Sequence, residues 1–171
     1  GAASGSAHGP SHAHKPERKG LPWDRREKED SAFFRTVRSV LFSPVDAFYR
    51  MKRQGDMGGP LLYCVSGCVV GSLATCLYNL LLQLVQMLML MSQLPGDKVA
   101  AVFTGLLVGT AIALGAVVVF AAISAVIGSF FNAALLHVCL LAVGGARHSY
   151  ETTFRVVCYT LGSTAMCQLI P

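Results

Sequence analysis

The chain has 171 residues and a formal net charge of +5, yet only 13% of its residues are charged and 53% are hydrophobic. Soluble domains carry roughly 25% charged residues, so this composition argues against a soluble globular protein. Eleven of the fourteen Lys and Arg residues precede residue 60. No aromatic stacking platform accompanies them, so nucleic acid is not predicted as a partner.

Residues 1–30 are rich in Gly, Ser, Ala, Pro, His and charged residues, and they show no hydrophobic period. Leu21 and Trp23 are the only sizeable apolar side chains among them. Such a segment buries too little apolar surface to offset the entropy lost on ordering, so we predict a disordered polar tail. Its three histidines have no rigid framework and no fourth ligand, so no metal site is predicted.

Residues 31–57 are predicted to form two basic amphipathic helices beside the membrane. In residues 31–42, SAFFRTVRSVLF, the apolar side chains fall on one arc of a helical wheel and the arginines fall opposite. Ser43 fits the N-cap of a second helix, and Pro44 fits its first position, where the missing N–H is harmless.

Basic amphipathic helices with aromatic residues lie in the plane of the membrane interface, where anionic lipids attract their cations. We therefore predict that this helix pair is an anchor on the cytoplasmic membrane surface. A helix pair packed on other protein is the alternative, because periodicity does not distinguish lipid from a protein partner. The predicted membrane-surface residues are Phe33, Phe34, Arg35, Arg38, Phe48, Tyr49, Arg50, Lys52 and Arg53.

Residues 58–171 contain three charge-free runs, which are predicted to lie in a bilayer. An uncharged apolar run of about 18 residues or more is long enough to cross as a helix. In lipid only helices and closed barrels pair every backbone polar group, and these runs are continuous rather than alternating. The predicted fold is therefore all-α: a polytopic transmembrane helical bundle with N-terminal amphipathic interfacial helices.

The predicted spans are 60–82, 117–143 and 153–170. Residues 99–144 would form a helix of about 68 Å, against a hydrocarbon core of about 30 Å. We therefore predict an extra or re-entrant apolar helix over 99–115, and a plain two-span hairpin is the alternative. Because Lys and Arg concentrate on the cytoplasmic side, the N-terminus and the Arg147 turn are both predicted to be cytoplasmic.

Small and polar residues inside the runs are predicted to mediate helix packing, either within the chain or between chains. Small residues four positions apart let helices approach closely in lipid. The predicted packing residues are Gly67, Gly71, Gly105, Gly109, Ser124, Gly128 and Asn132. Asn79 and His137 are the predicted intramembrane polar groups. An intramembrane His is a functional-site hypothesis by default, and a neutral His hydrogen-bonded within the bundle is the alternative.

The sequence contains no motif typical of catalysis. There is no acid–base pair in the apolar runs, no phosphate-cradling loop and no HExxH, and no serine has a suggestively placed His. No catalytic residue, metal or cofactor is predicted, and the protein is expected not to be an enzyme.

Three stretches carry a family resemblance: FFRTVRSVLFSPVDAFYRM, GGPLLYC and LLHVCLLAVGGARHSYETTFRVVCYTLGS. Over residues 33–171 the chain resembles the Yip-domain family, the Ypt/Rab-interacting membrane proteins, and its motifs are closest in style to the bacterial members. The resemblance implies about five spans with a cytoplasmic N-terminus. Because the third span matches 154–171, this chain is expected to lack the last two spans.

The predicted function is that of a non-enzymatic integral membrane protein, a membrane-organising scaffold or accessory subunit. Its expected partners are the lipid bilayer, anionic lipids, and other membrane proteins or second copies of the chain. The expected location is the bacterial inner membrane with the N-terminus cytoplasmic, and the ER or Golgi membrane is the alternative. The alternative function is a small transporter or channel component, with His137, Asn132 and Gln83 lining a polar path.

Overall fold

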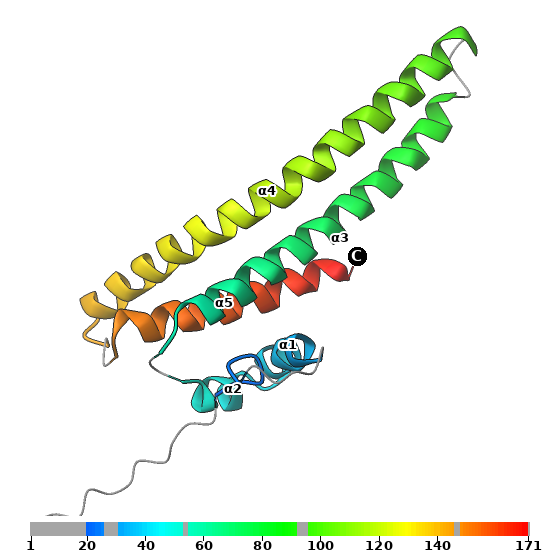
Figure 1. Cartoon of the computed structure of the whole chain (residues 1–171). Helices are drawn as coiled ribbons and strands as arrows, with labels where there is room; N and C mark the ends of the chain where they lie inside the picture. Colours follow the sequence, from blue (N-terminus) through cyan, green and yellow to red (C-terminus); the bar gives the residue numbers. More distant parts are fainter. Residues whose placement is uncertain (1–19, 26–30, 53–54, 92–95, 146–147, 171) are drawn as a thin grey trace, which may run out of the picture.

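The computed structural model describes residues 20–25, 31–52, 55–91, 96–145 and 148–170 (Figure 1). The described residues form five α-helices and a short 3-10 helix, and they contain no strand. The elements are α1 (Ala32–Phe42), α2 (Pro44–Arg50), α3 (Gly58–Met91), α4 (Gly96–Ala142), α5 (Tyr150–Ala165) and η1 (Met166–Leu169). The all-α fold predicted from the charge-free runs is therefore confirmed.

Helices α3 and α4 form a long antiparallel hairpin, and α5 lies along only part of it (Figure 1). Both helices are long and apolar enough to cross a membrane, over Gly58–Leu90 and Ala100–Ala142. Only 6% of the residues in the most apolar window of each are buried within the chain, whereas a core helix of a soluble domain is mostly buried. Their exposed side chains are large and apolar, a surface that suits hydrocarbon. The pair has the properties of a membrane-spanning hairpin.

The course of α4 differs from the prediction, because α4 is one uninterrupted helix of 47 residues. Neither a separate or re-entrant helix over 99–115 nor a two-span hairpin is present. This range contains no proline, and each of its glycines costs only about 1 kcal/mol relative to alanine, which is too little to break an apolar helix. At about 1.5 Å per residue α4 is about 70 Å long, more than one straight crossing requires.

A glycine turn reverses the chain after α4. Gly144 has a φ of 70°, a conformation that glycine adopts without steric cost. Its N–H donates to the Leu141 carbonyl at 3.0 Å, and the Gly145 N–H donates to the Leu140 carbonyl at 2.8 Å. These two bonds form a Schellman cap. The start of α5 consequently lies at the same end of the hairpin as the start of α3.

The prediction placed the N-terminal helices and the Arg147 turn in one compartment. The structure puts α1, α2 and the first turns of α5 at one end of the hairpin (Figure 1). Arg147 itself lies outside the described residues, and the identity of the compartment stays a prediction. The third predicted span, 153–170, comprises most of α5 together with η1.

Glycine allows α5 to pack backbone-to-backbone on α3. A Cβ atom added at Gly67 would lie 2.3 Å from the Gly162 carbonyl oxygen, and one added at Gly71 would lie 2.4 Å from the Ala165 carbonyl oxygen. Both distances are shorter than any real Cβ contact. Any larger side chain at these positions must push the two helices apart.

Small residues also line the inner face of α4. The buried positions recur every fourth residue: Ala121, Ala125, Ser129 and Ala133. Two of these alanines belong to a buried cluster with Cys64 of α3 and with Phe154 of α5. Association in lipid depends on close packing rather than on the hydrophobic effect, which explains why this stripe contains small side chains.

We expect Gly67→Ala to lower the free energy of unfolding by about 1–3 kcal/mol, because the added methyl group overpacks the contact between α3 and α5. Gly105→Ala is the matched control, since no other described element lies within 4 Å of a Cβ atom added there. The control should be neutral or stabilising by up to about 1 kcal/mol from helix propensity. Denaturant unfolding in detergent, followed by circular dichroism, compares the two. Equal stability would contradict the close α3–α5 contact.

Candidate functional site

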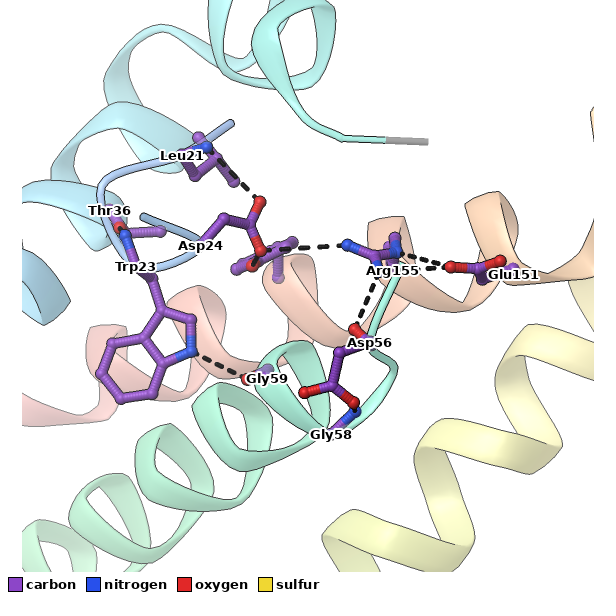
Figure 2. A network of polar contacts seen from close by, with 10 residues as sticks. Leu21, Trp23, Asp24, Thr36, Asp56, Gly58, Gly59, Glu151 and Arg155 are labelled. Carbon is purple, nitrogen blue, oxygen red and sulfur yellow. Dashed lines mark hydrogen bonds and ion pairs between the residues drawn. The ribbon is translucent and has the colours of Figure 1, made fainter. Parts of the chain in front are cut away.

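A buried arginine lies where the N-terminal helices meet the hairpin (Figure 2). Arg155, on α5, is 2% exposed. Its guanidinium lies 3.2 Å from the Glu151 carboxylate one turn earlier and donates to the Asp56 backbone carbonyl at 2.8 Å. A third partner, the Asp24 carboxylate, lies 3.9 Å away. Removing a buried charge from water costs several kcal/mol unless partners compensate for it. These partners therefore tie α5 to the start of α3 and to the segment before α1.

Asp24 belongs to a short docking segment, which we define as residues 20–25. The Asp24 carboxylate accepts a hydrogen bond from the Tyr159 hydroxyl at 2.6 Å and one from the Leu21 N–H at 3.4 Å. Together with the guanidinium of Arg155, these two groups give the Asp24 carboxylate three donors. Hydrogen bonds to an ionised acceptor are roughly twice as strong as neutral ones.

Trp23 fixes the other side of the docking segment (Figure 2). Its indole N–H donates to the Gly59 carbonyl at 2.8 Å, and its backbone N–H donates to the Thr36 hydroxyl at 3.2 Å. Its ring packs edge-on against Phe33 and Tyr63, with centroids 6.0 and 5.7 Å away. The indole thus contacts α1 and α3 at once.

The docking segment and the helix pair share one buried cluster with α3 and α5. Its buried members are Leu21, Val37, Val40, Ala47, Met51, Tyr63, Tyr159 and Met166. Within it, the hydroxyls of Tyr63 and Ser163 form a hydrogen bond of 2.7 Å. Every buried side-chain nitrogen and oxygen in the described part of the chain has a hydrogen-bond partner. The cluster therefore combines apolar packing with a hydrogen-bond partner for each buried polar side-chain atom.

The docking segment falls within the predicted disordered tail, 1–30, and here the structure differs from the expectation. Leu21 is only 2% exposed, and Asp24 lies beside a buried cation. Average composition over thirty residues does not reveal that a few of them fit a pocket formed by later parts of the chain. Residues 1–19 and 26–30 lie outside the described residues.

Comparison with known protein families identifies the family of this chain. The sequence model described as the Yip1 domain matches residues 38–171. This chain belongs to the Yip1 domain family. No curated protein and no solved structure matches it. The resemblance predicted from its motifs is thus confirmed, and the docking segment lies N-terminal to the Yip1-matched region whose Arg155 it contacts.

The predicted membrane-surface residues of this Yip1 domain protein lie on different faces of the helix pair. Phe34 and Tyr49 are exposed, whereas Phe33 and Phe48 are half-buried against the cluster. The basic residues Arg35, Arg38, Arg50 and Lys52 are exposed, and Arg53 lies outside the described residues. Part of the apolar arc of α1 packs on the chain's own α5 rather than facing outward, through Val37 and Val40.

The predicted packing residues of α4 lie away from the observed contact. Apart from the helix's own backbone and the two adjacent residues, no atom of the described chain lies within 4 Å of a Cβ atom added at Gly105, Gly109 or Gly128. Ser124 and Asn132 are exposed and donate to carbonyls of their own helix, at 3.2 and 2.8 Å. The buried stripe at Ala121–Ala133 occupies a neighbouring face of the helix. Gly67 and Gly71 of α3, in contrast, lie directly against α5.

The predicted polar groups do not gather along one path. His137 Nδ1 lies 3.1 Å from the Thr153 hydroxyl, and the ring lines a cavity of about 200 Å³ between α4 and α5, which His148 also lines. Asn79 is exposed and donates to the Thr75 carbonyl of its own helix at 2.9 Å. Gln83 lies about seven turns beyond the start of α3, whereas His137 is near the end of α4 that adjoins this start. Among the described residues, no cluster of three or more His, Cys, Asp or Glu side chains is arranged to hold a metal ion.

Removing the buried cation should destabilise the attachment of the helix pair. We expect Arg155→Met to lower the free energy of unfolding by about 3–5 kcal/mol, because Asp24 would remain buried without its counter-ion. Arg38→Met, at an exposed position of α1, removes the same charge and should change the free energy of unfolding by less than about 0.5 kcal/mol. Denaturant unfolding in detergent measures both. A loss in Arg155→Met no larger than in the control would contradict the role assigned to the buried guanidinium.

Proposed function

We propose that this Yip1-family protein is a non-enzymatic scaffold or accessory subunit that organises the membrane surface through its α1–α2 helix pair. One observation carries the proposal. The pair is attached to the membrane-spanning hairpin by the buried cluster around Arg155, and it still presents apolar and basic side chains outward. A rigidly attached interfacial helix pair is suited to positioning lipid or other proteins relative to the hairpin.

The outward side of the helix pair has the composition of a membrane-surface element. Phe42 and Val45 are 80% and 81% exposed, and Phe34 and Tyr49 are also mostly exposed. Large exposed apolar side chains next to cations lie favourably at the boundary between headgroups and acyl chains. Each near-surface cation adds on the order of 1 kcal/mol when the leaflet is anionic.

The leaflet we assign is the cytoplasmic leaflet of a bacterial inner membrane, with the ER or Golgi membrane as the alternative. The concentration of Lys and Arg before residue 60 supports the cytoplasmic side. The open face of α4 at Gly105 and Gly109 supports contacts with helices of other membrane proteins or of a second copy. A transport path near His137 has no comparable support, since His137 shares a hydrogen bond with Thr153 and Asn132 bonds within its own helix.

Anionic lipid should slow amide hydrogen exchange in the helix pair. In nanodiscs holding the full chain, we expect amide hydrogen exchange over residues 32–50 to slow when phosphatidylglycerol replaces half of the phosphatidylcholine. The slowing should be about fivefold or more, since each near-surface cation contributes about 1 kcal/mol. In the triple variant Arg38→Gln, Arg50→Gln, Lys52→Gln, exchange should no longer depend on the lipid. Mass spectrometry measures the exchange rates in both lipid mixtures.

A variant with the same change in net charge separates a local effect from a general one. Lys15→Gln, Arg18→Gln, Lys19→Gln removes three cations outside the helix pair. It should keep the lipid dependence. If wild-type exchange over residues 32–50 is the same in both lipid mixtures, the helix pair does not bind an anionic surface and the proposal is wrong.

A further inference from the structure

We propose that the surface of α1, α3 and α5 against which the docking segment packs is a peptide-binding site for a short segment in which tryptophan precedes an acidic residue. Residues 21–24 of the chain's own docking segment, Leu-Pro-Trp-Asp, occupy this site as an intramolecular ligand, and the same segment of a second copy can replace them. The inference is independent of lipid binding by the outward face of the helix pair.

The aromatic part of the site is built from two helices, α1, which follows the docking segment closely in sequence, and α3. Phe33 of α1 and Tyr63 of α3 contact the indole ring, and the Gly59 carbonyl accepts its N–H at 2.8 Å. Leu21 is buried in the same cluster. An apolar enclosure with a single acceptor placed for an indole N–H selects tryptophan over phenylalanine, which has no such donor.

The acidic part of the site lies on α5. The Tyr159 hydroxyl donates to the Asp24 carboxylate at 2.6 Å, and the Arg155 guanidinium lies 3.9 Å from it. Both donors are buried, with Tyr159 fully inaccessible. A hydroxyl and a guanidinium directed at one point recognise a carboxylate.

The site keeps its internal contacts when the ligand leaves. Arg155 retains Glu151 at 3.2 Å and the Asp56 carbonyl at 2.8 Å, so departure of Asp24 does not strand the buried cation. Tyr63 retains Ser163 at 2.7 Å and its ring contact with Tyr159. The docking segment is therefore the replaceable member of the network, whereas Arg155 and Tyr63 belong to the framework.

A second copy is the occupant that the structure favours. The ligand sequence known to fit is the chain's own, and each copy carries both the segment and the site. Exchange of an identical element between protomers recreates the same contacts and has a low energetic cost. Within one chain the attached segment competes at an effective concentration on the order of millimolar.

The test uses the full chain in nanodiscs and a fluorescein-labelled peptide of residues 20–25, Gly-Leu-Pro-Trp-Asp-Arg. The double variant Trp23→Ala, Asp24→Asn vacates the site. It should bind the peptide at least about tenfold more tightly than wild type, in which the attached segment competes. Fluorescence anisotropy measures the dissociation constants. Peptides carrying Trp→Ala or Asp→Asn should bind at least about tenfold more weakly than the parent peptide.

Two further variants of the vacated chain locate the binding. Adding Tyr159→Phe should weaken peptide binding severalfold, whereas adding Tyr150→Phe should not, because the Tyr150 hydroxyl bonds the Phe130 carbonyl outside the cluster. Circular dichroism and size exclusion establish that each variant is folded. Folded, vacated protein that binds no peptide overturns the proposal, as does equal binding by the vacated and wild-type chains.

Wild-type protein provides a measurement that does not depend on the variants folding. A photoreactive form of the peptide, with benzoylphenylalanine in place of its terminal arginine, whose counterpart Arg25 is exposed, should label α1 or α5 at millimolar concentration. An excess of the parent peptide without the photoreactive group should suppress this labelling, and the Trp→Ala peptide should not. Absence of specific labelling in wild type contradicts exchange. Labelling suppressed equally by unrelated apolar peptides would identify a general apolar groove and overturn the assigned specificity.

Discussion

The guanidinium of Arg155 is the constraint that joins the docking segment and the approach to α3 to α5. A cation that is 2% exposed requires compensation, and the chain supplies it from three separate segments. Glu151 comes from the preceding turn of α5, Asp56 from the approach to α3, and Asp24 from the docking segment. Glu151 and the Asp56 carbonyl hold the cation with or without the docking segment, and Asp24 adds a third contact at 3.9 Å. The docking segment in turn reaches α1 through the bond from the Trp23 N–H to the Thr36 hydroxyl.

The hairpin depends on a different interaction, close contact between small residues. Gly67 and Gly71 let α5 touch the backbone of α3, and a stripe of alanine and serine brings α4 alongside. The contact of α5 and η1 ends near Thr75, whose hydroxyl donates to the Gln168 side chain at 3.3 Å. Past the C-terminal end of α5 and η1, the described hairpin consists of α3 and α4 alone, and its apolar sides are open to lipid or to other helices (Figure 1).

Local patterns in the sequence were sufficient to predict the helical class and the apolar runs long enough to span a membrane. They also predicted the family and the division of the N-terminal helices at Pro44. The faces of the helices were harder, because a four-residue spacing recurs on several faces of an apolar helix. The stripe at Ser124, Gly128 and Asn132 has the same period as the buried one that includes Ala125 and Ser129. Only the position of α3 and α5 decides between them. The docking segment and Arg155 are a long-range pairing, for which neither partner carries a local signal.

The two interactions differ in kind but meet at Tyr63, whose ring lies 2.9 Å from a Cβ atom added at Gly162 and also contacts the Trp23 indole. Packing of Gly67 against Gly162 involves no charge, whereas the attachment of the docking segment depends on the ionised forms of Asp24 and Arg155. Contacts that share a partner couple rather than simply add, and Tyr63 is a partner of both. Its hydroxyl bonds Ser163 next to Gly162, and its ring packs against Trp23 of the docking segment. The attachment of the docking segment and the glycine contact between α3 and α5 therefore have different physical origins but are coupled through one side chain.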